Sequence, residues 1–208
     1  MEKYIKEACV ETIDQCVRAE KNGADRIELC DDLANDGLTP PIHLIQQAKE
    51  RLKIPIRVMI RPRPGDFVYS DEDIDEMKRS IGICKDIGVE GVVFGACTAE
   101  NTLDLKTISY LVTTAKPLKV TIHKAIDSCD DPVQELINLQ NLSVDSVLSS
   151  GKAAKALEGV SLLSEMVQNA GDIELIACGK VKDSNLAEVD SLVHAPAYHG
   201  KKIVGDLK

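Results

Sequence analysis

Two arginines set close together in a stiff segment give the first chemical signal in the chain. Arg61 and Arg63 stand in residues 61–66 (RPRPGD), where two prolines and a glycine shape the backbone. Guanidinium groups held in a fixed direction bind carboxylate or phosphate through paired hydrogen bonds. The segment therefore predicts a site for an anionic ligand. The alternative is that Arg61 neutralises a carboxylate elsewhere in the fold, such as Glu28.

Carboxylates and thiols alternate in two further segments. Glu7 and Cys9 are two residues apart, as are Glu28 and Cys30, so each pair shares one face if its segment is a strand. The two glutamates, together with Asp66, are candidates for catalytic proton exchange. Cys30 is the candidate ligand for Cu(I), a soft ion that prefers thiolates. The open alternative is that both thiols are ordinary buried groups.

A histidine and an aspartate close together form a third candidate group. His123 is followed by Lys124 and, four residues on, by Asp127. A neutral imidazole near carboxylates can act as a general acid or base near pH 7, and Asp127 is a candidate for the same role. His194 is a weaker second candidate. A structural role for His123 remains the alternative.

Small residues occur in two later segments, residues 149–152 (SSGK) and 178–180 (CGK). Backbone N–H groups at such positions can bind an anion, so Ser150, Gly151 and Gly179 are predicted to contact a negatively charged substrate. Glycine also ends strands for purely steric reasons, which is the alternative.

The seven cysteines occur singly, without a C-x-x-C pair, and their number is odd. This distribution favours reduced thiols in a reducing compartment. Four of the thiols fall near the ends of predicted strands, but sequence spacing does not show whether they converge on a metal: Cys9, Cys30, Cys97 and Cys178.

The overall charge and the distribution of apolar residues limit the kinds of partner that the protein can bind. The formal net charge is −9, with 34 acidic and 25 basic residues, which disfavours nucleic acid and anionic membranes as general partners. A basic pocket at one place on the protein is still compatible with this negative net charge. The first residues do not resemble a signal peptide, and no run of about 18 apolar residues predicts a membrane span. We expect a cytoplasmic protein.

The candidate residues recur at the ends of short apolar segments that alternate with amphipathic ones, a pattern typical of βα units. The pattern predicts a (β/α)8 TIM barrel, formed by a single domain over residues 1–208, with a short or missing final helix. An open doubly wound sheet is the rival, but no glycine-rich fingerprint follows the first strand. Strands are expected at 4–10, 25–30, 54–61, 91–95, 118–123, 144–150, 172–178 and 191–196. Helices are expected at 12–22, 42–52, 71–87, 104–115, from about 132, at 156–170 and at 184–189.

Several segments together resemble one known family. Residues 26–30 (RIELC), 36–40 (DGLTP), 58–63 (VMIRPR) and 122–127 (IHKAID) are similar to motifs of the CutC family, described as copper homeostasis proteins. The resemblance implies a TIM barrel in the cytoplasm that handles copper, with Cu(I) as its only cofactor. Carried over by motif, the family residues fall on Cys30, Arg61, Arg63, Asp66, His123 and Asp127.

The chain departs from the family pattern at several positions, including Pro64 and Lys124, and it has a shorter C-terminal end. The shortened end predicts a homodimer or higher homo-oligomer in which a partner covers the last face of the barrel. Two functions are therefore weighed. One is Cu(I) binding and handling through Cys30. The other is a hydrolase- or lyase-type enzyme for a small anionic or glycosidic metabolite, using Arg61, Arg63, Asp66, His123 and Asp127.

Overall fold

The computed structural model describes residues 4–207, which form a closed barrel of eight parallel strands in sequential order. The predicted barrel is thus confirmed, since each strand is hydrogen-bonded to the next and the eighth pairs with the first. The strands are β1 (Ile5–Val10), β2 (Arg26–Leu29), β3 (Ile56–Met59), β4 (Gly91–Phe94), β5 (Lys119–Ile122), β6 (Ser146–Ser149), β7 (Glu174–Ala177) and β8 (Ala197–Gly200).

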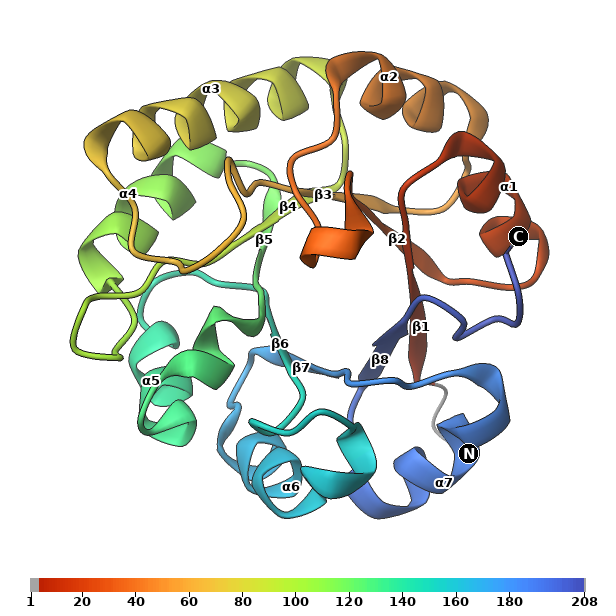
Figure 1. Cartoon of the computed structure of the whole chain (residues 1–208), viewed down its shortest axis with the longest axis vertical. Coiled ribbons are helices and arrows are strands. Elements are labelled where there is room, and N and C mark those ends of the chain that lie inside the picture. The colour runs from red at the N-terminus through yellow and green to blue at the C-terminus, as the bar shows by residue number, and fades with distance from the viewer. Residues whose placement is uncertain (1–3, 208) are drawn as a thin grey trace.

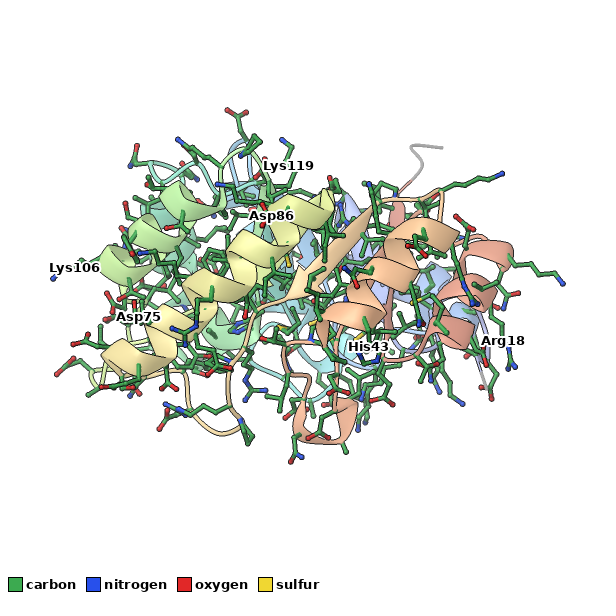
Figure 2. All side chains as sticks on the ribbon, turned by 90° about the horizontal axis from the view of Figure 1, so that it is seen from above. Arg18, His43, Asp75, Asp86, Lys106 and Lys119 are labelled. Carbon is green, nitrogen blue, oxygen red and sulfur yellow. The ribbon has the colours of Figure 1, made fainter. Side chains whose placement is uncertain are left out.

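Helices surround the barrel and pack their apolar faces onto it, as Figure 1 shows. Their charged side chains lie on the outer surface, for example Asp75 and Lys106 in Figure 2. The α-helices are α1 (Ile13–Lys21), α2 (Ile42–Arg51), α3 (Asp71–Ile87), α4 (Leu105–Ala115), α5 (Pro132–Leu139), α6 (Val160–Asn169) and α7 (Asp183–Val193). Short 3-10 helices are η1 (Leu33–Asn35), η2 (Lys124–Ser128) and η3 (Ala156–Glu158).

The prediction for the eighth strand is wrong. Residues 191–193 continue α7, because Leu186, Val189 and Val193 bury one face of a longer helix. His194 ends that helix in a left-handed conformation, and β8 begins at Ala197. The side chain that enters the barrel is therefore that of His199. Between β8 and Leu207 no further helix follows, as expected for a missing final helix.

A polar network fills the barrel beneath the site. Arg26 pairs with Glu7 and, at 2.8 Å, with Glu174. Arg57 donates to Glu90 at 3.0 Å and to the hydroxyls of Thr121 and Ser146, both at 2.7 Å. Charged groups this deeply buried are retained only where each has partners. The network fixes the inward faces of β1, β2 and β3, which also carry the residues of the site.

None of the helices in residues 4–207 is long and apolar enough to cross a membrane.

Candidate functional site

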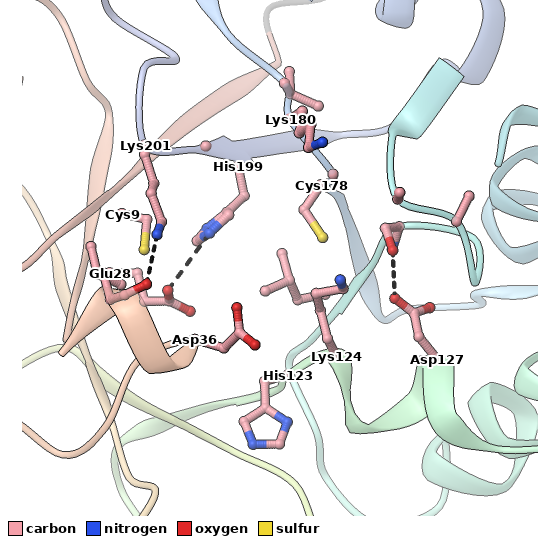
Figure 3. Close-up of a pocket in the computed structure, with 18 of the residues that line it drawn as sticks. Cys9, Glu28, Asp36, His123, Lys124, Asp127, Cys178, Lys180, His199 and Lys201 are labelled. Carbon is pink, nitrogen blue, oxygen red and sulfur yellow. Dashed lines mark hydrogen bonds and ion pairs between the residues drawn. The ribbon is translucent and has the colours of Figure 1, made fainter. Parts of the chain in front are cut away.

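A cavity of about 930 Å³ opens at the carboxyl ends of the strands, the end where barrels of this class carry their sites. Its wall includes Cys9, Glu28 and His199 on one side, and Figure 3 shows these three as a group. Lys124, Cys178 and Lys180 lie in another part of the same cavity. Residues that are far apart in the sequence therefore meet here.

The group of Cys9, Glu28 and His199 offers one sulfur, one carboxylate oxygen and one imidazole nitrogen within 4.8 Å of one another. Cys9 and Glu28 come from β1 and β2, and their inward direction confirms that each carboxylate and thiol pair shares a face. Glu28 Oε1 is buried and has no hydrogen-bond partner among the described residues. An unpartnered buried acceptor beside a thiol and an imidazole fits a bound metal ion.

Cys30 lies beside this group. Its thiol donates to Glu28 Oε2 at 3.4 Å. The neighbouring thiol of Cys30 and His199 lower the pKa of Cys9 well below its usual value despite burial. Cys30 keeps its proton, because the neighbouring Cys9 and burial raise its pKa. One thiolate with a second thiol in contact is a donor set suited to a soft cation.

Two glutamates hold the ring of His199 in place. Its Nδ1 lies 2.9 Å from Glu7 Oε1, and its Nε2 lies 3.7 Å from Glu28 Oε2. Burial raises the pKa of Glu7, but Arg26 and His199 outweigh this effect and lower it to about 2. Burial lowers the pKa of His199, but Glu28, Cys9 and Glu7 outweigh this effect and raise it well above its usual value. The ring is therefore protonated without a metal ion and has to release a proton to bind one, while the carboxylate of Glu7 fixes its orientation. Glu7, predicted to exchange protons, thus orients His199 instead.

Burial has the opposite effect on Glu28. Removal from water is the largest influence and raises the pKa of this carboxyl to about 8, although His199 nearby opposes the shift. Without a bound cation the carboxyl is therefore largely protonated at pH 7. Of the other thiols near strand ends, Cys178 lines the cavity, whereas Cys97 contacts Cys129 outside it.

Arg61 lies in the cavity wall and is only 5% exposed. Its guanidinium donates to the carbonyls of Asn35 and Gly37, at 3.0 and 3.2 Å, and to that of Gly65 at 2.9 Å. It forms no ion pair with a carboxylate among residues 4–207, and its Nε has no partner there. The proposed pairing with Glu28 is therefore not formed, and the buried positive charge is not neutralised by an acid.

His123 also lines the cavity and is 4% exposed. Its Nδ1 accepts a hydrogen bond from the Ala125 N–H at 3.1 Å, so the proton of the neutral ring is on Nε2. Burial and, next, the charge of Arg61 lower its pKa to about 3. The ring is neutral at pH 7, and its Nε2–H has no partner among the described residues.

Arg63 and Asp66 lie outside the cavity. They form an exposed ion pair at 3.0 Å, and Arg63 also binds Asp73 of α3 at 2.9 Å. The side chains hold the loop 62–70 against the helix start. Of the predicted anion-binding pair, only Arg61 therefore reaches the site.

Asp127 lines the cavity but already has partners. Its carboxylate accepts from the Ser149 hydroxyl at 2.5 Å and from the N–H and hydroxyl of Ser150, both at 2.9 Å. The Gly151 N–H donates to the Ser149 hydroxyl. The donors predicted to bind an anion at Ser150 and Gly151 are thus used within the protein, whereas Gly179 remains in the wall. His194, the second histidine candidate, is exposed at the end of α7.

Sequence reasoning missed His199, and it placed Cys9 beside Glu7 on one strand face without predicting it as a metal ligand. The segment that contains His199 has no β-branched residue, since it reads AYHG. Nothing in the spacing links it to Glu7, from which it is separated by most of the chain. Its place in the barrel follows only from the register, in which Glu7 lies opposite His199.

The fold and site define a TIM barrel with a thiol, imidazole and carboxylate centre at the carboxyl ends of its strands. Comparison with family models matches residues 4–203 to the CutC family. The chain therefore belongs to the CutC family.

Curated relatives and solved structures agree with this assignment. The human copper homeostasis protein cutC homolog is 40% identical over 197 residues, covering 94% of this chain and 72% of that protein. A family protein CutC from Mesorhizobium japonicum is 42% identical over 184 residues, covering 88% and 71%. A crystal structure of the putative copper homeostasis protein CutC from Streptococcus agalactiae superposes with a TM-score of 0.92 at 28% identity, covering 97% of this chain and all of that one.

Proposed function

We propose that this protein handles copper by binding Cu(I) at the ends of β1, β2 and β8. The observation that carries the proposal is the convergence of Cys9, Glu28 and His199 in one corner of the cavity, with the thiol of Cys30 3.4 Å from Glu28 Oε2. Cu(I) prefers thiolate and imidazole ligands, whereas hard cations such as Mg²⁺ prefer oxygen. The names of the human and streptococcal relatives, which refer to copper homeostasis, support the same choice.

Each residue has a distinct part in this proposal. Cys9 supplies a thiolate, and Cys30 supplies a second sulfur after it releases its proton to the solvent. His199 supplies an imidazole after it, too, releases a proton, and Glu7 maintains the orientation of the ring. Glu28 remains a hydrogen-bond partner of the ligands, because a soft ion gains less from oxygen than from sulfur. Bound copper would be cargo, and no chemical step is assigned to it.

The experiment is a competition titration of reduced protein with Cu(I) against a chromogenic Cu(I) chelator. We expect Cys9→Ser and Cys30→Ser each to weaken binding at least tenfold, because each substitution replaces a soft ligand with a hydroxyl. Cys178→Ser is the matched control, since that thiol lines the same cavity away from the group. X-ray absorption of the loaded protein should report two sulfur neighbours. Equal affinity in all four proteins, or loss only in Cys178→Ser, would refute the proposed ligands.

A further inference from the structure

The cavity is far more basic than the chain that forms it. Seven of the 25 lysine and arginine residues line it, against three of the 34 acidic residues. The acids are Glu28, Asp36 and Asp127, and the last of these is already bound by Ser149 and Ser150. Like charges gathered around one opening repel each other, and a bound anion relieves that repulsion. In a protein of net charge −9 this local field selects a negatively charged ligand.

The lysines gather because three consecutive strands end in the same dipeptide. Gly151-Lys152, Gly179-Lys180 and Gly200-Lys201 lie at the ends of β6, β7 and β8, and all of these residues except Gly151 line the cavity. The glycines let neighbouring loops touch: a Cβ at Gly179 would lie 2.9 Å from the Ala156 nitrogen, and one at Gly200 would lie 2.0 Å from the Val181 carbonyl oxygen. The close approach brings the three cationic loops together.

Lys124 and Lys180 are among the cations that are free to bind a ligand. Lys152 and Lys201 donate to backbone carbonyls, of Cys129 and Leu33. Lys124 and Lys180 form no hydrogen bond or ion pair with the residues described, and both side chains are exposed toward solvent. Lys180 also has a positive φ of 54°, a conformation that side chains other than glycine adopt at a cost. The N–H groups of Gly179 and Lys180 donate to no described residue either.

The other part of the cavity offers neutral or buried donors. Nε2 of His123 and Nε of Arg61 both lack partners among residues 4–207, and both side chains are at least nine-tenths buried. Buried N–H groups of this kind are costly to leave unpaired, so a ligand that brings oxygen atoms stabilises them. The volume of about 930 Å³ accommodates a metabolite larger than an inorganic ion.

We propose that the cavity binds a small organic phosphate. Its phosphate group lies between Lys124, Lys180 and the backbone N–H groups of the loop after β7, and its hydroxyl or carbonyl oxygens face Arg61 and His123. Lysine is a point-charge ligand for phosphate, and barrels of this class often bind phosphate at the loops after the seventh and eighth strands. This site is separate from the thiols, so it does not depend on copper binding.

The test is calorimetric titration of reduced, metal-free protein with ribose 5-phosphate, ribose, inorganic phosphate and malonate at low salt. We expect ribose 5-phosphate to bind, ribose to give no heat, inorganic phosphate to bind more weakly and malonate to bind less well than either phosphate. Lys124→Ala and Lys180→Ala should each weaken ribose 5-phosphate binding about tenfold, since each removes a charged contact. Lys106→Ala, on the outer face of α4, is the control and should bind as the wild type does.

A second variant separates binding from folding. Lys180→Gly removes the side chain but suits the positive φ, so its thermal midpoint should not fall while phosphate binding is lost. Absence of binding by both phosphates overturns the proposal, as does an equal loss in Lys106→Ala and Lys180→Ala. Malonate binding as tightly as ribose 5-phosphate would overturn the choice of phosphate. Because no copper is present, none of these outcomes bears on the Cu(I) site.

Discussion

The neutral state of His123 makes a quantitative prediction about acid stability. Burial and Arg61 lower the pKa of this ring from 6.5 to about 3 in the folded protein, whereas the unfolded chain titrates near 6.5. Between these values the unfolded state binds a proton that the folded state does not. The contribution of His123 to the stability of the fold is therefore nearly constant above pH 7 and falls as the pH drops below 6.5. Linkage over this window gives a loss of roughly 2 kcal/mol between pH 7.5 and pH 5.

The perturbation is His123→Asn. Asparagine keeps an acceptor for the Ala125 N–H at the start of η2 but does not titrate. The smaller side chain lowers stability by an amount that does not depend on pH. Urea unfolding at several pH values should therefore show the variant less stable at pH 7.5 and the gap reduced by roughly 2 kcal/mol at pH 5.

His43→Asn supplies the control, because it removes an exposed histidine from α2. Its stability relative to the wild type should stay nearly constant over the same range. If the gap between wild type and His123→Asn is the same at both pH values, the ring is not held neutral, and the assignment of a free Nε2–H donor in the cavity is wrong.

Two further substitutions test the polar groups that support the site. Arg57→Met should lower the free energy of unfolding by about 3–5 kcal/mol in urea titrations, because Thr121 and Ser146 lose a buried charged donor. A loss under about 1 kcal/mol would show that the polar network around Arg57 is not needed for stability. Tyr198→Phe should cost about 1–3 kcal/mol, since its buried hydroxyl links Asp190 at 2.8 Å to the Ala195 N–H at 2.9 Å. Tyr110→Phe, at an exposed position on α4, is the control and should change stability by less than about 0.5 kcal/mol. Equal effects of Tyr198→Phe and Tyr110→Phe would refute the stabilising role of the Tyr198 hydroxyl.

Periodicity was enough to predict the barrel and to show which carboxylate and thiol share a strand face. Short apolar segments at regular spacing mark β1 to β7, and the two-residue alternation of Glu7 with Cys9 and of Glu28 with Cys30 confines each pair to one face. Which face points inward depends on the neighbouring strands and helices, so the sequence left it open. The structure resolves it through contacts, as in the hydrogen bond from Cys30 to Glu28.

The eighth strand was not predicted correctly because its alanine and glycine allow tight packing but have low strand propensity. Leu192 and Val193 resemble the start of a strand, yet Val193 completes the buried face of α7. The true strand contains alanine and glycine, and Gly200 must leave room for the Val181 carbonyl. The last strand of a barrel pairs with the first, so contacts between these two strands join residues that are very distant in the sequence. His199 and Glu7 meet only because β8 pairs with β1.

The roles of charged residues could not be predicted from their types alone. Asp127 has the position of a catalytic acid, but the hydroxyls of Ser149 and Ser150 bind its carboxylate. Arg63 has the chemistry of an anion ligand, but Asp66 and Asp73 neutralise it at the surface. In both cases a nearby partner decides the role, and that partner is identified by three-dimensional contact rather than by sequence spacing.

The arginine-rich segment and the thiols suggested ligands of opposite charge, and the structure separates the two. The soft donors lie at β1, β2 and β8, whereas the free lysines lie at the ends of β5 and β7. A Cu(I) ion bound by two thiolates carries a net charge of −1, so nearby lysines favour that complex and also favour the thiolates that form it. A cationic cavity and the proposed Cu(I) site are thus electrostatically compatible. Because the lysines and the thiols lie at the ends of different strands, we expect each substitution to act mainly on one ligand: Lys180→Ala should weaken phosphate binding far more than Cu(I) binding, and Cys30→Ser should do the reverse.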